Sequence, residues 1–133
     1  MILLDTNIIL RFILDDDPQL SPKARKLIEN IQQGETKVHI SLLAVSAVIF
    51  TLERSYKLPK LDIVQKLPLL FQLQNIVVEQ ENLLKQTFIY YINKNVSFID
   101  SYHAAFMEKK RIKGIYSFDR DFDKFPKIKR LEN

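Results

Sequence analysis

Three aspartates lie where the sequence predicts strands to end or helices to begin. Asp5 and Asp119 each follow a short apolar run, and Asp100 opens a segment with the pattern of a helix. An aspartate at a helix start accepts a backbone N–H and favours the positive end of the helix dipole, so capping explains each of them alone. If the three meet at one edge of a sheet, their charges repel unless a cation neutralises them. Mg²⁺ or Mn²⁺ is the ion that such an all-oxygen site prefers.

The elements that would position these acids alternate between short apolar strands and helices. Strands are expected at 2–4, 38–40, 76–78, 115–118 and 128–131, and helices at 7–14, 21–33, 42–56, 59–73, 81–94 and 99–112. This alternation predicts an α/β fold, a three-layer sandwich in which helices cover both faces of a central, short-stranded parallel sheet. Sites in such sheets lie beyond the carboxyl ends of the strands. The length predicts a single domain over residues 1–133.

Local signals mark where three of the helices begin or end. Ser21-Pro22 is typical of an N-cap followed by proline at the first helical position. Ser41 precedes a helix whose apolar residues are spaced by three and four, which predicts one buried stripe ending at Tyr56. Gly114 is expected to end the helix that Asp100 opens.

Composition excludes several classes of protein. Hydrophobic residues make up 47% of the 133 residues and charged residues 27%, which excludes a disordered chain. The absence of cysteine excludes disulfides, zinc–thiolate sites and thiol nucleophiles. No apolar run approaches the ~20 residues of a membrane span, and the amino terminus lacks the build of a signal peptide. We therefore expect a cytoplasmic protein with no membrane partner.

Three segments resemble the PIN domain family, and most closely the VapC-type toxins of bacterial toxin–antitoxin pairs. They are Met1-Ile-Leu-Leu-Asp-Thr-Asn, Phe98-Ile-Asp-Ser and Ser117-Phe-Asp-Arg-Asp-Phe. The resemblance covers nearly the whole chain and implies a PIN-like fold and a metal-dependent endoribonuclease. It also implies a protein antitoxin as partner and a homodimer. A divalent ion suits this reaction because it lowers the pKa of a bound water and acts as a Lewis acid at the phosphate.

The resemblance assigns the metal site to the three aspartates. Asp5 would be the central ligand of Mg²⁺ or Mn²⁺, and Asp100 and Asp119 would complete the catalytic pocket. Asp121 competes with Asp119 or adds to it, because the Asp-Arg-Asp spacing leaves the register open. His103 lies three residues after Asp100, a spacing that allows a ligand pair on one helix face but equally suits a packed or partly exposed ring.

Three polar residues next to these acids would support them. By the resemblance, Thr6, Asn7 and Ser117 would orient the carboxylates through hydrogen bonds. A separate acidic run at 15–17 lacks the glycine and glutamate of a calcium loop, so we interpret it as a solvated turn.

One position departs from the family's pattern. Family members carry a glutamate on the middle helix that faces the metal, and the matching residue here is Ala47. Glu53 cannot replace it, because six residues of helix turn its side chain about 120° away. Arg54 shares the face of Ala47 and could contact a phosphate, a pocket aspartate or solvent alone. The departure predicts a weakened site with at most one metal, held by Asp5 and Asp100, whether the alanine is natural or was introduced to silence the enzyme.

The excess positive charge gathers near the carboxyl terminus. Residues 1–100 carry 11 basic and 11 acidic side chains, and residues 101–133 carry 9 and 5. The group 109–111 with Lys113 lies near a helix end, where cations favour the dipole. With Arg120, the same group could hold an RNA backbone beside the acidic pocket.

Two other functions compete with the nuclease. A PIN fold without its glutamate could bind RNA or an antitoxin without cutting. A phosphoacceptor switch also gathers acids at strand ends, but it needs an aspartate after the third strand, where residues 79–81 are Glu-Gln-Glu. We therefore discount the switch and keep the binding module as the alternative.

Overall fold

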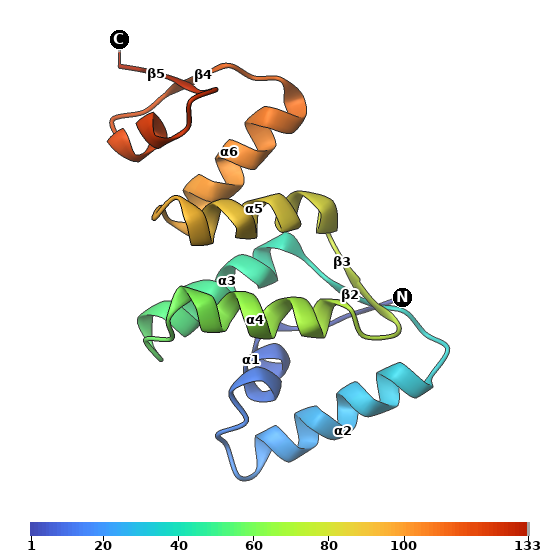
Figure 1. Ribbon diagram of the computed structural model, residues 1–133. Helices are drawn as coiled ribbons and strands as arrows, with labels where there is room; N and C mark the ends of the chain where they lie inside the picture. Colours follow the sequence, from blue (N-terminus) through green and yellow to red (C-terminus); the bar gives the residue numbers. More distant parts are fainter. Residues whose placement is uncertain (133) are drawn as a thin grey trace. The chain divides into compact units, whose positions relative to one another are not determined.

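Short strands and helices alternate along the whole described chain (Figure 1). The structure is a computed structural model that describes residues 1–132. Its elements are β1 (Ile2–Leu3), α1 (Thr6–Leu14), α2 (Leu20–Gln33), β2 (Val38–Ile40), α3 (Leu42–Arg54), α4 (Lys60–Phe71), β3 (Ile76–Val78), α5 (Glu81–Asn93), α6 (Phe98–Lys110), β4 (Gly114–Tyr116), the 3-10 helix η1 (Arg120–Lys124) and β5 (Lys129–Leu131). The α/β class and every predicted strand and helix are confirmed, with shifts at the ends. The one element that the sequence did not predict is η1.

The chain divides into two compact units, Met1–Glu79 and the residues from Gln80 onward. Each unit has its own sheet, β1–β2–β3 in the first and β4–β5 in the second, and every strand pair is parallel. The sequence placed all five strands in one sheet, and its prediction of a single domain stays a prediction. No helix of residues 1–132 is long and apolar enough to span a bilayer.

In the first unit, the middle strand β2 and the helices share one apolar core. Val38 and Ile40 of β2 are buried, and α1, α3 and α4 contribute Ile9, Leu52 and Ile63. Burying a valine, leucine or isoleucine side chain of this kind stabilises a domain by about 1.5–3 kcal/mol. Packing of this core fixes the positions of β1, β2 and β3, and so of the residues that follow them.

One prediction for the helices of this unit is right and two are wrong. The Ser41 hydroxyl caps α3 by accepting the Ala44 N–H at 3.1 Å, as expected. The stripe does not reach Tyr56, which follows the end of α3 and is 41% exposed.

Ser21 does not cap α2, which begins one residue earlier at Leu20. The Asp17 carboxylate accepts the N–H groups of Gln19 and Leu20, at 2.9 and 2.8 Å. The Ser21 hydroxyl is buried and donates to the carbonyl of Arg11 instead. The acidic run is thus part of a helix start, and the pKa of Asp17 is lowered chiefly by the Leu20 N–H and then by that of Gln19.

In the second unit, α5 and α6 pack against each other (Figure 1). Phe98 of α6 lies between two aromatic rings of α5, with ring centroids 6.0 Å from Phe88 and 6.1 Å from Tyr91. Such tilted and edge-to-face pairs stabilise beyond the area they bury. They fix the amino-terminal turn of α6, which carries Asp100.

The end of α6 corrects the expectation for Gly114. The helix ends at Arg111, whose left-handed backbone (φ 58°) lets its N–H reach the carbonyls of Glu108 and Met107. Gly114 is instead the first residue of β4, opposite Lys129 of β5. A Cβ at this position would lie 3.3 Å from Leu131 Cδ1, so glycine permits the close approach of the two strands.

Candidate metal centre

Asp100 lies in the first turn of α6, and a serine fixes that turn. The Ser97 hydroxyl accepts the Asp100 N–H at 3.1 Å, and the Ser101 hydroxyl donates to the Ser97 carbonyl at 2.8 Å. The helix start therefore has its cap in Ser97. The half-buried carboxylate of Asp100 is not needed for capping.

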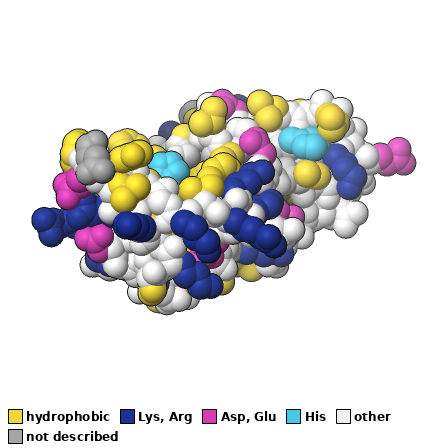
Figure 2. Space-filling view, turned by 90° about the horizontal axis from the view of Figure 1, so that it is seen from above, with side chains coloured by type: hydrophobic (Ala, Val, Ile, Leu, Met, Phe, Trp, Pro, Cys, Tyr) yellow, Lys and Arg dark blue, Asp and Glu magenta, His cyan; other side chains and the backbone are white. Residues whose placement is uncertain are grey.

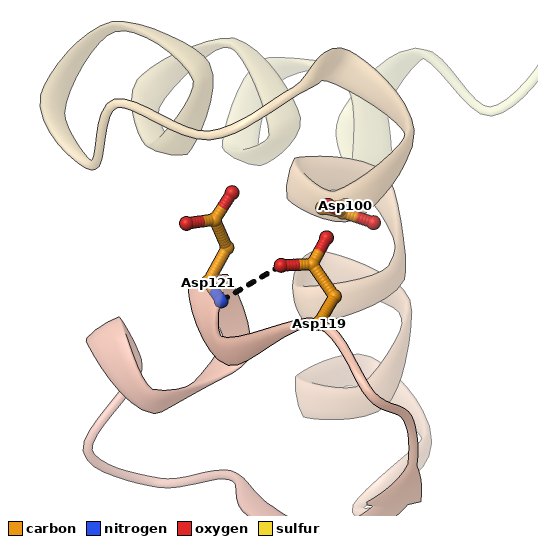
Figure 3. A group of neighbouring side chains, drawn as sticks. All are labelled: Asp100, Asp119 and Asp121. Atoms are coloured by element: carbon orange, nitrogen blue, oxygen red, sulfur yellow. Dashed lines mark hydrogen bonds between the residues drawn. The ribbon is translucent and has the colours of Figure 1, made fainter.

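Asp119 follows β4 and begins η1. Its Oδ1 accepts the Asp121 N–H at 2.9 Å, drawn as the dashed line in Figure 3. The Ser117 hydroxyl accepts the Asp119 N–H at 3.0 Å. The turn after β4 thus directs the carboxylates of Asp119 and Asp121 towards the start of α6.

The carboxylates of Asp100, Asp119 and Asp121 come together (Figure 3). One oxygen from each lies within 4.8 Å of the others. Around an octahedral Mg²⁺ at about 2.1 Å, neighbouring oxygens are about 3.0 Å apart and opposite ones about 4.2 Å, so closing this group around an ion needs movements of up to about 2 Å. The donors are all carboxylate oxygens, which fits Mg²⁺ or Mn²⁺.

The electrostatics of Asp100 show that this proximity has a cost. Burial raises the pKa of the Asp100 carboxyl, and the Asp119 carboxyl raises it further through a hydrogen bond and through repulsion. Ser97 and His103 act in the opposite direction and lower it. A cation between the two carboxylates would remove the repulsion that disfavours their ionised forms.

Asp121 differs from the other two because it has a cation of its own. Lys124 Nζ lies 3.1 Å from Asp121 Oδ1 and donates to the Asn95 carbonyl at 3.0 Å. Among residues 1–132, no ion pair reaches Asp100 or Asp119. Of the two acids in the Asp-Arg-Asp segment, Asp119 is therefore the freer to bind a metal.

The remaining predicted site residues belong to the first unit. Asp5 is exposed and caps α1, and its Oδ1 accepts the Thr6 N–H at 2.8 Å. Asn7 is exposed in the first turn of the same helix, and Ala47 is exposed near the middle of α3. That Asp5 joins the three carboxylates stays a prediction, and so does the orienting role of Thr6, Asn7 and Ser117.

The sequence left the roles of Arg54 and His103 open, and the structure shows what surrounds each side chain. The Arg54 guanidinium lies 5.1 Å from the ring centroid of Phe50, a cation–π contact along α3. His103 is exposed on α6, one turn beyond Asp100. Its effect on the Asp100 pKa is the smallest of those acting on that carboxyl.

Sequence reasoning missed Ser97 and Lys124. Ser97 could have been found from the Ser-x-x-Asp spacing at the start of a helix, which is typical of a capping box. Lys124 lies three residues after Asp121, a spacing at which opposite charges meet on one helical turn. The signal for Lys124 depends on predicting η1.

Comparison with known proteins identifies the family of the chain. The family model for the PIN domain matches residues 2–128. A VapC ribonuclease of Aquifex aeolicus (strain VF5) is 25% identical over 124 residues, which are 93% of this chain and 91% of that protein. A crystal structure of VapC20 from Mycobacterium tuberculosis, a sarcin-ricin loop cleaving toxin, is 20% identical with a TM-score of 0.44, over 92% of this chain and 93% of that one. Because the family model spans nearly the whole chain, the chain belongs to the PIN domain family.

Proposed function

We propose that this chain is a metal-dependent endoribonuclease, the toxin of a toxin–antitoxin pair, and that Ala47 weakens it. Asp5, Asp100 and Asp119 would hold Mg²⁺ or Mn²⁺ and form the catalytic pocket. The similarity to a VapC ribonuclease over nearly the whole of both chains supports an RNA substrate. A protein antitoxin and a homodimer are part of the same proposal.

The observation that carries the proposal is the meeting of carboxylates from α6 and from the turn after β4. Capping accounts for Asp119, but the cap of α6 is Ser97. The Asp100 carboxylate therefore approaches Asp119 although this raises its pKa, and the hydrogen bond with Ser97 opposes the rise only in part. A bound cation would turn this repulsion into attraction.

The residues of the pocket would divide the work of phosphodiester hydrolysis. A divalent ion, when bound, supplies a bound water of lowered pKa and a positive charge next to the phosphate. Asp100 and Asp119 would fix the ion at the start of α6, with Ser97 and Ser117 holding the backbone of each. Lys124 would hold the Asp121 carboxylate in place beside the pocket through their ion pair.

Restoring the missing acid tests the proposal. Ala47→Glu should raise Mn²⁺-dependent cleavage of RNA by roughly 100-fold or more, because groups that merely orient a metal ligand already contribute 10–100-fold. Ala47→Gln has the same size without the charge and serves as the control. Asp100→Asn in the Ala47→Glu background should abolish the gain.

The alternative is a PIN-fold module that binds RNA or an antitoxin without cutting. Ala47 favours it, because an alanine cannot bind a metal. RNA binding with no cleavage in Mn²⁺, even after Ala47→Glu, would support the module and contradict the enzyme.

A further inference from the structure

Six basic side chains surround the carboxyl-terminal end of α6. They come from two stretches of the chain and are all exposed: Lys109, Lys110, Arg111, Lys113, Lys127 and Lys129. We call these six residues the basic cluster. Figure 2 shows lysine and arginine side chains gathered side by side on the face that it draws.

The parallel pairing of β4 with β5 brings the two stretches together. The Lys129 N–H donates to the Lys113 carbonyl at 2.8 Å, and Gly114 lies opposite Lys129. A cavity of about 150 Å³ opens between the stretches, lined by Arg111, Lys113 and Lys127 among others. Four of the cations would suit the helix dipole alone, but the dipole does not account for the cations of β5 and the loop before it.

The acids of the second unit do not neutralise the basic cluster. Three aspartates belong to the metal centre, and Asp123 and Glu132 both pair with Arg130. Glu108, the nearest acid in sequence, accepts a hydrogen bond from the Tyr90 hydroxyl. Within residues 1–132, none of the six cations forms an ion pair. Glu108 also lines the cavity, but one carboxylate among six cations leaves an excess of positive charge that an anion from outside the chain would neutralise.

The cluster lies too far along α6 to act on the phosphate being cut. Ten residues separate Asp100 from Lys110, and at 1.5 Å per residue this is about 15 Å. That these cations, with Arg120, hold RNA backbone beside the acidic pocket stays a prediction. Arg120 is in η1, next to Asp119, and is not part of the cluster.

We propose that the basic cluster is a second RNA-binding site, which holds the phosphodiester backbone away from the point of cleavage. The proposal rests on the proposed function for its choice of RNA as the polyanion. Arg111 presents the planar fork that binds phosphate oxygens in pairs, and the lysines act as point charges. A site of this kind strengthens RNA binding without taking part in the reaction.

The salt dependence of RNA binding tests the proposal. The probe is a fluorescein-labelled single-stranded RNA in EDTA, so that no divalent ion is present and no cleavage occurs. The triple variant Arg111→Gln, Lys113→Gln, Lys127→Gln should lower the slope of log K against log salt concentration by about 2, at about 0.7 per phosphate contact. Its affinity at about 0.1 M salt should fall at least about tenfold.

Two further variants distinguish the effect of the basic cluster from the effect of the protein's net charge. The matched triple Lys23→Gln, Lys26→Gln, Lys66→Gln removes the same charge from exposed positions of the first unit and should keep the slope. The charge-preserving variant Lys113→Arg, Lys127→Arg should also keep it. An equal fall in slope for both Gln triples would overturn the proposal, as would no fall in either.

The result can be read independently of the cleavage assay. If Ala47→Glu does not cleave RNA but the cluster triple lowers the slope of log K against log salt concentration, the result supports the second RNA site and contradicts the nuclease. If polyglutamate of matched charge competes as well as unlabelled RNA, the cluster binds acidic polypeptide and the RNA assignment is wrong.

Discussion

Helices α3 and α6 begin in the same way and end up with different surfaces. Each has 13 residues and a serine N-cap, and in each the hydroxyl accepts the N–H of the third residue on, at 3.1 Å. On α3 the exposed positions Leu43, Ala47 and Phe50 carry no charge, whereas α6 carries Asp100 in its first turn and a basic cluster at its end.

The comparison shows that an N-cap residue determines where a helix begins but not which chemistry the helix surface carries. The buried side of α3 is built from four large β-branched or leucine side chains, and that of α6 includes two alanines. The first helix therefore contributes mainly apolar packing, and the second combines thinner packing with charge. Four sets of substitutions test this difference and the packing around it.

The largest effect is expected in the apolar helix. Leu52 is fully buried, so Leu52→Ala should lower the free energy of unfolding by about 2–5 kcal/mol, measured by urea denaturation. Leu43 is on the same helix and 82% exposed, so Leu43→Ala should change it by less than about 0.5 kcal/mol. Equal losses for the two variants would mean that α3 is not packed as described.

The next effect concerns the charge on α6. Asp100→Asn should weaken Mn²⁺ binding at least about tenfold in calorimetric titration, because it removes a charged ligand. The same variant should unfold at an equal or higher temperature than the parent without metal, since it also removes the repulsion from Asp119. Asp123→Asn is the control, because Asp123 pairs with Arg130 and is not one of the three clustered carboxylates, so this variant should keep the Mn²⁺ response. Loss of the response in both variants would count against the metal centre.

Much of this comparison was predictable from sequence, and the failures have a common cause. Apolar spacing predicted both helices, and the strand-end rule predicted that Asp100 and Asp119 would meet. The errors at Ser21 and Gly114 arose where two nearby groups competed for one local role. Asp17 took the cap of α2, and the left-handed Arg111 ended α6 before the glycine. Local pattern lists the candidates for such a role, but packing decides among them.

The two serine caps should contribute alike to stability and differ in metal binding. Ser41→Ala and Ser97→Ala should each lower the free energy of unfolding by about 1 kcal/mol, the usual loss of an N-cap hydrogen bond. Only Ser97→Ala should also weaken Mn²⁺ binding, because it frees the turn that holds Asp100. Equal Mn²⁺ affinity in the two variants would show that the cap of α6 has no part in the metal centre.

The smallest effect tests the polar contact between α5 and α6. Burial raises the pKa of Tyr90 to about 12, and the hydrogen bond that its hydroxyl donates to Glu108 raises it too. A raised tyrosine pKa favours folding below the unfolded value of 10.0, and this contribution is lost as the pH rises through about 12. Tyr90→Phe removes the titrating group, so the parent should be more stable than the variant at pH 8 by less than about 1 kcal/mol.

Urea denaturation should show this difference in stability shrinking at higher pH, because ionised Tyr90 and Glu108 repel each other. A difference that stays constant from pH 8 to beyond about 11 would mean that the hydroxyl does not depend on Glu108.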